Sequence, residues 1–363
     1  MKLLIVKLSS LGDVVHTFPA LTDAARAVPG LVVDWAVEEA MVPLVRLHPA
    51  VRRAIPVPLR RLKKSPLAGW RSEEGRALRA ALAEERYDLI IDAQGLMKSA
   101  GIARFAKGKR HGFAWGSARE GIATLLYHRR HAIPEVEHMA ARIRKLFAAA
   151  LGYDLTALPA DAGLKVEPAP AEAPYLVLLH GTTWLTKTWT VLRWRELAAI
   201  AETAGLKTRI FALGEEETRR AEAIARGMPS VEILPPAPID QLAPILAGAE
   251  GVVGVDSGLG HLAAALGVPT VGLYGPTDAR LTGLFGPKVL EMRSFRPCAP
   301  CENAHCKIAP HTVEGPPCMV DHGARAAWRG LNVLRHGHAD KMDKTGPGVA
   351  QGTPSAPQQR PAS

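Results

Sequence analysis

Several features that define other protein classes are missing from this sequence of 363 residues. It has no run of about 18 apolar residues, which a membrane-spanning helix requires. Its first residues, Met1 to Lys7, hold too short an apolar core for a signal peptide and no small-residue cleavage site. Aromatic residues make up only 5% and form no stacking ladder of the kind that binds single-stranded nucleic acid. We therefore expect a cytoplasmic protein with no nucleic-acid partner.

The common nucleotide-binding motifs are also absent. No GxGxxG follows the first expected strand, and no GxxxxGK[ST] occurs anywhere. Instead, residues 256–276, which read DSGLGHLAAALGVPTVGLYGP, follow a buried strand and open an apolar helix. Gly258 and Gly260 leave the backbone bare at the start of this helix, where unpaired N–H groups and the helix dipole attract phosphate. The sequence therefore predicts a phosphate site in its second half.

The length and the alternating strand and helix patterns predict an α/β protein of two Rossmann-like domains with parallel sheets facing a central cleft. We expect a first domain over 1–157, a Pro-rich linker over 158–174 and a second domain over 175–340. The final residues, 341–363, are rich in Gly, Pro, Ser and Gln and are expected to be disordered. Strands are expected at 3–8, 32–37, 55–59, 89–92, 175–179, 208–213, 231–234, 252–255 and 270–274, and helices at 19–28, 71–85 and 323–334, the last packing back across the first domain.

The chain carries a net charge of +10, from 45 basic and 35 acidic residues. Such a balance favours an anionic partner, but nucleic acid, an acidic membrane surface and a phosphorylated substrate all agree with it. A basic nucleic-acid-binding protein is therefore the non-enzymatic alternative.

Asp13 is the candidate general base. It follows the first expected strand in a loop with Gly12, and ligands of open α/β sheets gather beyond the carboxyl ends of the strands. A carboxylate at this place could also cap the helix expected to begin near Val14. His16 is a second candidate base, although a lone histidine in an apolar stretch is more often structural.

The loop from His180 to Trp189 follows another buried strand and suits a diphosphate. Thr182 and Thr183 supply hydroxyl donors, and Lys187 supplies charge. A surface loop with an incidental lysine is the alternative. Glu215 to Glu217 follow the strand at 208–213, where a carboxylate could hold ribose hydroxyls or simply form an acidic first helical turn.

The first domain also contains a dense basic run, which includes Arg60, Arg61 and Lys64. It fits either an anionic acceptor or a solvated basic face.

All four cysteines lie in one segment, Cys298, Cys301, Cys306 and Cys318, with the spacing C-x2-C-x4-C-x11-C. Four thiolates complete a tetrahedral site, so this Cys-rich loop over 298–318 predicts a structural zinc ion. Free thiols are the alternative, and His305 and His311 are substitute ligands.

Five segments together resemble the bacterial lipopolysaccharide heptosyltransferases of glycosyltransferase family 9, and most of all the heptosyltransferase I group, which adds the first inner-core heptose. These segments are LLIVKLSSLGDVVHTFPALTDAARAVPG, VVDWAVEE, YDLIIDAQGLMKSA, HGTTWLTKTW and VDSGLGHLAAALGVPTVGLYGPTDARL. The resemblance covers roughly residues 1 to 290. It implies a GT-B architecture and an inverting transfer of L-glycero-D-manno-heptose from ADP-heptose to a Kdo residue of lipid A. A later-acting heptosyltransferase and a sugar-nucleotide epimerase are the alternatives within this architecture.

The resemblance also implies roles for individual residues. Asp13 would deprotonate the acceptor, and no cofactor would be required because Lys187 and the helix start neutralise the leaving group. The implied donor-binding residues are Thr182, Thr183, Lys187, Glu216, Glu217, Asp256, Ser257, Gly258 and His261. The implied acceptor-binding residues are Ser9, Ser10, Gly12, Arg60, Arg61, Lys64, Lys98, Arg119, His138 and Arg142. Together with the basic first domain, the lipid acceptor implies peripheral association with the cytoplasmic face of the inner membrane.

Overall fold

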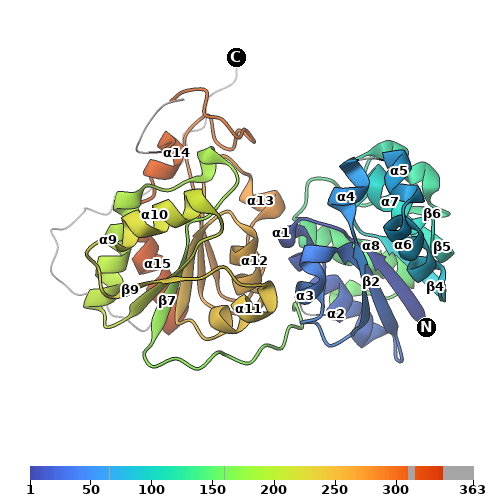
Figure 1. Ribbon diagram of the computed structural model, residues 1–363, viewed down its shortest axis with the longest axis horizontal. Coiled ribbons are helices and arrows are strands. Elements are labelled where there is room, and N and C mark those ends of the chain that lie inside the picture. Colours follow the sequence, from blue (N-terminus) through green and yellow to red (C-terminus); the bar gives the residue numbers. More distant parts are fainter. Residues whose placement is uncertain (65, 159, 310–314, 338–363) are drawn as a thin grey trace, which may run out of the picture.

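The computed structural model describes residues 1–64, 66–158, 160–309 and 315–337, and the tail expected to be disordered lies outside them. The chain folds into two lobes, each built around a parallel six-stranded sheet (Figure 1). The strand order is β3-β2-β1-β4-β5-β6 in the first sheet and β12-β11-β10-β7-β8-β9 in the second. Both orders reverse beside the first strand of the sheet, which is where ligands bind in open α/β sheets. The predicted α/β fold is confirmed.

The first lobe alternates strands and helices, with both faces of the sheet covered. Leu3 and Ile5 of β1 point to the face packed by α2 and α8, whereas Leu4 and Val6 point to the face packed by α4, α6 and α7. The elements are β1 (Lys2–Val6), α1 (Leu11–Val15), α2 (Phe18–Ala27), β2 (Val32–Glu38), η1 (Glu39–Met41), α3 (Val42–Val45), β3 (Val51–Val57), α4 (Leu59–Lys64), α5 (Pro66–Arg71), α6 (Glu73–Ala83), β4 (Arg86–Asp92), α7 (Met97–Ala103), β5 (Lys107–Phe113), η2 (Gly121–Leu126), β6 (Arg129–His131), α8 (Met139–Leu151) and η3 (Leu155–Ala157).

The second lobe repeats this plan. Its elements are β7 (Tyr175–Leu179), η4 (Leu185–Lys187), α9 (Val191–Thr203), β8 (Lys207–Phe211), α10 (Glu215–Ala225), β9 (Val231–Leu234), α11 (Ile239–Ala247), β10 (Gly251–Val255), α12 (Gly258–Ala265), β11 (Thr270–Tyr274), α13 (Ala279–Thr282), β12 (Val289–Arg293), α14 (Pro317–Val320) and α15 (Ala324–His336). Among the described residues of 158–174, none belongs to a helix or strand, and the domain limits stay predictions.

Two expectations about helices were wrong. The first short helix begins at Leu11, not near Val14, because Ser10 rather than Asp13 occupies the N-cap position. The last helix, α15, packs against α9 and strands β10, β11 and β12 of the second sheet, not across the first lobe. Its buried residues Ala324, Ala327 and Leu331 recur at helical spacing and complete the apolar face of that sheet.

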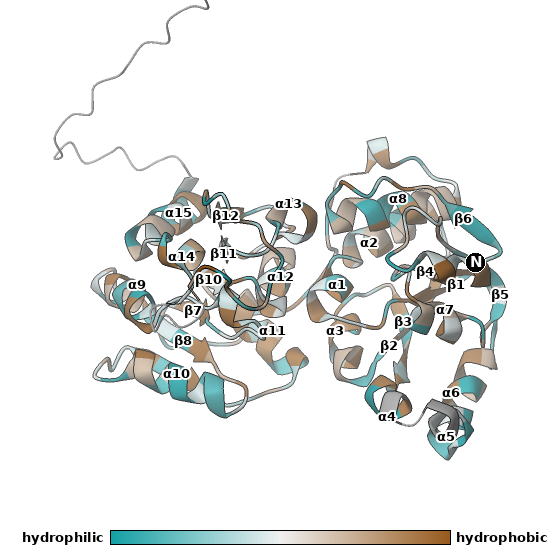
Figure 2. Ribbon diagram, turned by 90° about the horizontal axis from the view of Figure 1, so that it is seen from above, coloured by the Kyte–Doolittle hydropathy of each residue, from teal (hydrophilic) through white to brown (hydrophobic). Residues whose placement is uncertain are grey.

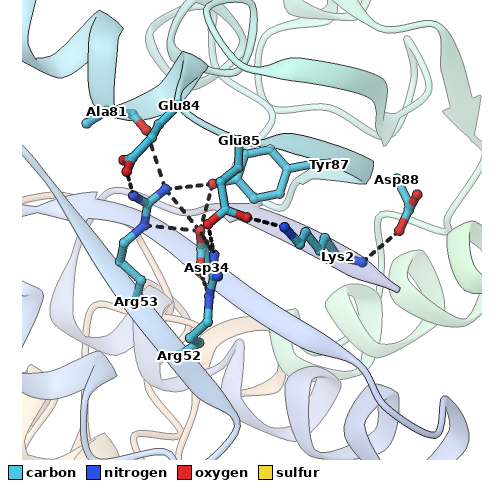
Figure 3. Close-up of polar contacts among 9 residues, drawn as sticks. All are labelled: Lys2, Asp34, Arg52, Arg53, Ala81, Glu84, Glu85, Tyr87 and Asp88. Carbon is cyan, nitrogen blue, oxygen red and sulfur yellow. Dashed lines mark hydrogen bonds and ion pairs between the residues drawn. The ribbon is translucent and has the colours of Figure 1, made fainter.

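A buried carboxylate anchors the end of the first sheet that lies away from the cleft (Figure 3). Asp34 of β2 accepts hydrogen bonds from Arg52 Nε at 2.9 Å, Arg53 Nε at 3.1 Å and the Tyr87 hydroxyl at 2.7 Å. Glu85 extends the network by pairing with Arg52 at 2.7 Å. Because a buried charge is tolerated only when it is paired, these contacts fix β2, β3 and the start of β4 relative to one another.

Candidate active site

Asp13 lies in the first turn of α1 and is held by its surroundings. Its Oδ2 accepts hydrogen bonds from the backbone N–H and the hydroxyl of Ser10, both at 3.0 Å. Its Oδ1 lies 3.4 Å from Nζ of Lys7, which is buried and also donates to the carbonyl of Ala93 at 3.2 Å. Asp13 therefore does cap its helix, from inside the first turn, and its carboxylate remains 19% exposed.

The charge on Asp13 is strongly favoured. Burial raises the pKa of Asp13, but Lys7, the N–H of Ser10 and Arg119 together hold this pKa well below its usual range. The carboxylate is consequently ionised at neutral pH. His16 is fully buried, and burial together with nearby His261 and His138 holds its pKa well below the usual value, so His16 is neutral there.

The second lobe contributes a carboxylate and a lysine that neutralise each other. Lys187 Nζ lies 2.7 Å from Oδ2 of Asp256, and the Thr277 hydroxyl donates to the same oxygen at 2.8 Å. His261 Nε2 lies 3.6 Å from Oδ1. Burial raises the pKa of Asp256, but the nearby His261 and the charge of Lys187 outweigh it and leave the pKa far below its usual range. The Lys187 ammonium also lies 4.5 Å from the centre of the Trp184 ring.

The helix start predicted as a phosphate site is present. Strand β10 ends at Val255, Ser257 is the N-cap of α12, and Gly258 is the first helical residue. The N–H groups of this first turn have no partner within the helix. Within the described residues, Ser257 Oγ and His261 Nδ1 are buried without a hydrogen-bond partner. Buried polar atoms of this kind are costly, so they mark a place where a polar ligand gains hydrogen bonds.

A cleft of about 560 Å³ joins the two lobes. Most of the predicted donor-binding residues line it, together with Ser10 and Gly12 from the first lobe. The predicted residues that line it are Ser10, Gly12, Thr182, Thr183, Lys187, Glu217, Asp256, Ser257, Gly258 and His261. Asp13 directly follows Gly12 but is not itself among the lining residues.

The lobes touch where α1 meets α12, which Figure 1 shows between the two sheets. A Cβ atom added at Gly12 would lie 2.7 Å from Cδ2 of His261, and one added at Gly258 would lie 2.7 Å from Cβ of Leu11. Both distances are shorter than real contacts, so the helix starts approach this closely only because both residues are glycines. Nearby, His16 Nε2 and His138 Nε2 each lie 3.1 Å from the carbonyl oxygen of Gly283 across the same boundary.

The two glutamates predicted to hold ribose differ in position. Glu217 lines the cleft, lies against Gly181 and accepts a hydrogen bond from the N–H of Leu213 at 2.9 Å. Glu216 does not line the cleft and instead pairs with Arg219 at 3.0 Å and Arg220 at 3.3 Å. Of these two residues in the acidic first turn, Glu217 faces the cleft and Glu216 lies on the outer surface of the helix.

The predicted acceptor-binding residues are spread more widely than the donor-binding residues. Ser9 accepts a hydrogen bond from Gln94 at 2.8 Å through its carbonyl. Arg119 is exposed and close enough to Asp13 to lower its pKa, and Lys98 lies part-buried on α7. Arg60 pairs with Glu38 at 3.1 Å.

The remaining acceptor candidates contact other residues of the fold, except Lys64, whose side chain lies outside the described part of the structure. Arg61 pairs with Glu39 at 2.7 Å and Glu74 at 2.8 Å, and Lys64 ends α4, with its side chain outside the described atoms. His138 is the N-cap of α8. Arg142 is buried, donates to the carbonyl of Ser117 at 2.6 Å and lies over the ring of Phe113. The structure therefore gives His138 and Arg142 contacts that stabilise the fold around the cleft.

All four cysteines line a separate cavity of about 240 Å³ together with His305. Burial, and then the nearness of the other three thiols, raises the pKa of Cys318 to about 11. Within the described part of the chain, no group of three or more His, Cys, Asp or Glu side chains is arranged to hold a metal ion, and His311 lies outside that part. Structural zinc stays a prediction.

The Cys-rich loop is attached to the donor side of the cleft. Thr186 Oγ1 donates to the carbonyl of Asn303 at 2.7 Å, and the N–H of Glu302 donates to the carbonyl of Pro276 at 2.8 Å. These contacts hold the residues immediately before Lys187 and Thr277. The loop therefore supports two of the three residues that contact Asp256, Lys187 and Thr277.

A sequence model of glycosyltransferase family 9 (heptosyltransferase) matches residues 75–311. The chain is 46% identical over 314 residues to lipopolysaccharide heptosyltransferase 1 of Pseudomonas aeruginosa, which covers 85% of this chain and 88% of that protein. The chain belongs to glycosyltransferase family 9. It is thus a glycosyltransferase, and the sequence resemblance is confirmed.

Solved structures of this family agree with the fold. The Escherichia coli heptosyltransferase WaaC with ADP superposes with a TM-score of 0.80 at 38% identity, covering 92% of this chain and all of WaaC, 100%. WaaC with ADP-2-deoxy-2-fluoro heptose gives a TM-score of 0.77 at 38% identity, covering 92% of this chain and 99% of WaaC. The two facing α/β lobes of the glycosyltransferase are therefore a GT-B architecture.

None of its described helices has the length and apolar character needed to cross a membrane.

Proposed function

We propose that this glycosyltransferase moves L-glycero-D-manno-heptose from ADP-heptose to a Kdo residue of lipid A, with inversion at the anomeric carbon. The observation that carries the proposal is that the candidate base and the candidate phosphate-binding groups lie on opposite sides of one cleft. An ionised carboxylate at Asp13 adjoins the cleft from one lobe, while Lys187 and the start of α12 line it from the other. The relative solved with an ADP-heptose analogue supports the choice of donor.

The donor half suits a nucleoside diphosphate sugar. Thr182, Thr183 and the N–H groups at Gly258 supply donors for the diphosphate, and Glu217 is placed to accept hydrogen bonds from ribose hydroxyls. Lys187 supplies the positive charge. Because its ammonium pairs with Asp256 in this structure, diphosphate binding must compete with that ion pair or share the lysine with it.

The reaction then follows as one displacement. The acceptor hydroxyl forms a bond to the anomeric carbon as Asp13 takes its proton, and the bond from that carbon to the diphosphate oxygen breaks, releasing ADP. Lys187 and the helix start stabilise the negative charge that develops on ADP. These groups neutralise the leaving group, so the proposal assigns no cofactor to catalysis.

The acceptor is proposed to approach from the first lobe. Arg119 is exposed and close enough to Asp13 to lower its pKa, and Lys98 lies part-buried on α7 of the same lobe; cations there suit the carboxylate of Kdo and the phosphates of lipid A. A lipid acceptor also places the enzyme at the cytoplasmic face of the inner membrane as a peripheral protein.

The test is transfer by the purified chain with ADP-heptose and Kdo-lipid A, followed by mass and anomeric configuration of the product. We expect one added heptose of inverted configuration and one ADP released per transfer. Transfer that requires an acceptor already carrying heptose would assign a later step of the core. Transfer with retention would overturn the single-displacement mechanism.

A further inference from the structure

An exposed apolar patch lies on the first lobe between β5 and β6. Its three large side chains, Trp115, Ile122 and Leu125, are 63%, 53% and 63% exposed. Ile122 and Leu125 are three residues apart in the 3-10 helix η2, so they lie on the same side of it. A Cβ added at Gly121 would lie 2.9 Å from the Trp115 ring, which places that ring over the start of the same helix. We call these three side chains the Trp115 patch.

The surroundings of the Trp115 patch are strongly basic. Residues 97–131 contain eight lysines and arginines and one acidic residue, Glu120, so this segment carries much of the net charge of +10. Two of these cations hold η2 directly, because Arg130 Nε donates to the carbonyl of Thr124 at 2.8 Å and Arg110 Nε donates to that of Leu126 at 2.9 Å. Other cations of the segment are exposed, namely Arg104, Lys107, Lys109, Arg119 and Arg129.

The Trp115 patch is joined to the catalytic loop through buried hydrogen bonds. Tyr127, which follows η2, donates to Oδ2 of Asp92 at 2.7 Å, and Asp92 Oδ1 accepts from the N–H of Gln94 at 2.9 Å. Gln94 in turn donates to the carbonyl of Ser9 at 2.8 Å. Arg119 lies between Trp115 and η2 in sequence and acts electrostatically on Asp13. A partner surface that binds the Trp115 patch therefore also orients the loop that contains Ser9 and Asp13.

We propose that the Trp115 patch is a docking surface for an anionic lipid bilayer. Tryptophan and aliphatic side chains enter the interfacial layer of a bilayer, while clustered lysines and arginines are attracted to anionic head groups. Exposed apolar side chains on and beside one short helix, within a basic surround, match such a layer better than they match water. Docking in this way presents the Asp13 loop to sugars that project from the bilayer. The inference rests on the proposed function, which includes peripheral association with the membrane, and adds the surface that makes the contact.

The test uses the full chain and vesicles without any acceptor. We compare phosphatidylcholine vesicles that contain phosphatidylglycerol with vesicles of phosphatidylcholine alone, and measure binding by flotation. The variant replaces Trp115, Ile122 and Leu125 by Ser. The matched control replaces Leu192 and Phe295, which are 73% and 99% exposed on the other lobe, by Ser. We expect salt-sensitive binding of the wild type and the control to the anionic vesicles, and a loss of about tenfold for each apolar side chain removed from the patch.

A second measurement separates docking from catalysis. With a water-soluble, deacylated Kdo acceptor, the patch variant should keep the wild-type kcat/KM, whereas with acceptor embedded in vesicles it should lose activity in parallel with binding. Wild-type vesicle binding by the patch variant would overturn the docking surface. The docking surface would also be overturned if the wild-type protein does not bind the vesicles and instead self-associates through the patch. Absence of transfer by every protein, with vesicle binding lost only in the patch variant, would overturn the proposed function and leave the docking surface standing.

Discussion

Replacing Asp13 by Asn tests the proposed mechanism most directly. The amide keeps an oxygen that can accept from Ser10, so the first turn of α1 should survive, but it cannot take a proton from the acceptor. A general base contributes about 10²- to 10⁴-fold to a rate, so we expect kcat to fall by that factor, equivalent to about 3 to 5 kcal/mol of activation free energy. Donor affinity should stay nearly unchanged, because most of the donor-binding residues belong to the second lobe.

The Asp13→Asn change also affects stability, and this effect must be separated from catalysis. Lys7 is 1% exposed and loses its counter-ion, although it still donates to Ala93. A buried cation left with one neutral acceptor costs about 1 to 3 kcal/mol of unfolding free energy. Adding Lys7→Met removes the orphaned charge, so the double variant should regain stability in urea titrations while transfer stays slow.

The assay is ADP release from ADP-heptose with Kdo-lipid A, alongside calorimetric ADP binding. Asp88→Asn is the matched control, since it removes one exposed carboxylate that accepts from the backbone of Lys2 at the far end of the same sheet. Because the pKa of Asp13 is held well below its usual range, its carboxylate is ionised throughout the range from about pH 5 to 8, and wild-type kcat/KM should show no acid limb from this residue there. Wild-type kcat in Asp13→Asn, or recovery of rate together with stability in the double variant, would refute the assignment.

Three further outcomes can be measured. Lys187→Ala removes the cation beside Asp256, so ADP affinity measured by calorimetry should fall by about 10- to 100-fold. The control is Arg193→Ala, which removes a cation from the surface of α9 and should lower ADP affinity less. Equal losses in the two variants would contradict the role of Lys187. Burial lowers the pKa of His48 and of His180 to about 4, so their neutral forms stabilise the fold above about pH 6.5. This contribution to the unfolding free energy, about 3 kcal/mol for each histidine, is lost progressively as the pH falls towards 4. An unfolding free energy that is constant between pH 7.5 and 5 would disagree. Mass analysis of metal in the purified chain should find about one zinc per chain, lost in Cys318→Ser, whereas a metal-free, stable protein would identify the cysteines as free thiols.

The sequence was sufficient for strands that are apolar runs but not for strands that are rich in charged residues. Strands such as β7 and β11 are continuous apolar runs buried along their whole length, and their limits were predicted correctly. The strands that escaped prediction are β5, β6 and β12, at or beside sheet edges. Strand β5 reads KGKRHGF and exposes alternate residues, so its composition resembles a basic loop until its partner strands are known.

The same limit applies to the candidate site. Loops after buried strands, such as the one holding Lys187, could be found because position and residue type both point to a ligand. Thr277 was missed, although it directly follows the stretch 256–276, because one hydroxyl after a strand has no distinguishing pattern. Lys7 was missed because only the folded structure brings it to Asp13. Conversely, Arg142 has a suitable charge, but its hydrogen bond to the distant Ser117 cannot be read from the sequence. The ion pairs of Glu216 with Arg219 and Arg220 have ordinary helical spacing and could have been weighed from the sequence.

The glycine contact between α1 and α12 sets the width of the reaction site. Gly12 and Gly258 allow the two lobes to lie as close together as they do, since a Cβ atom at either position would clash with His261 or Leu11. A single methyl group at either position is a spacer that separates base from donor while removing no charged group. The separation of the two halves of the site is thus controlled by two residues that carry no side chain.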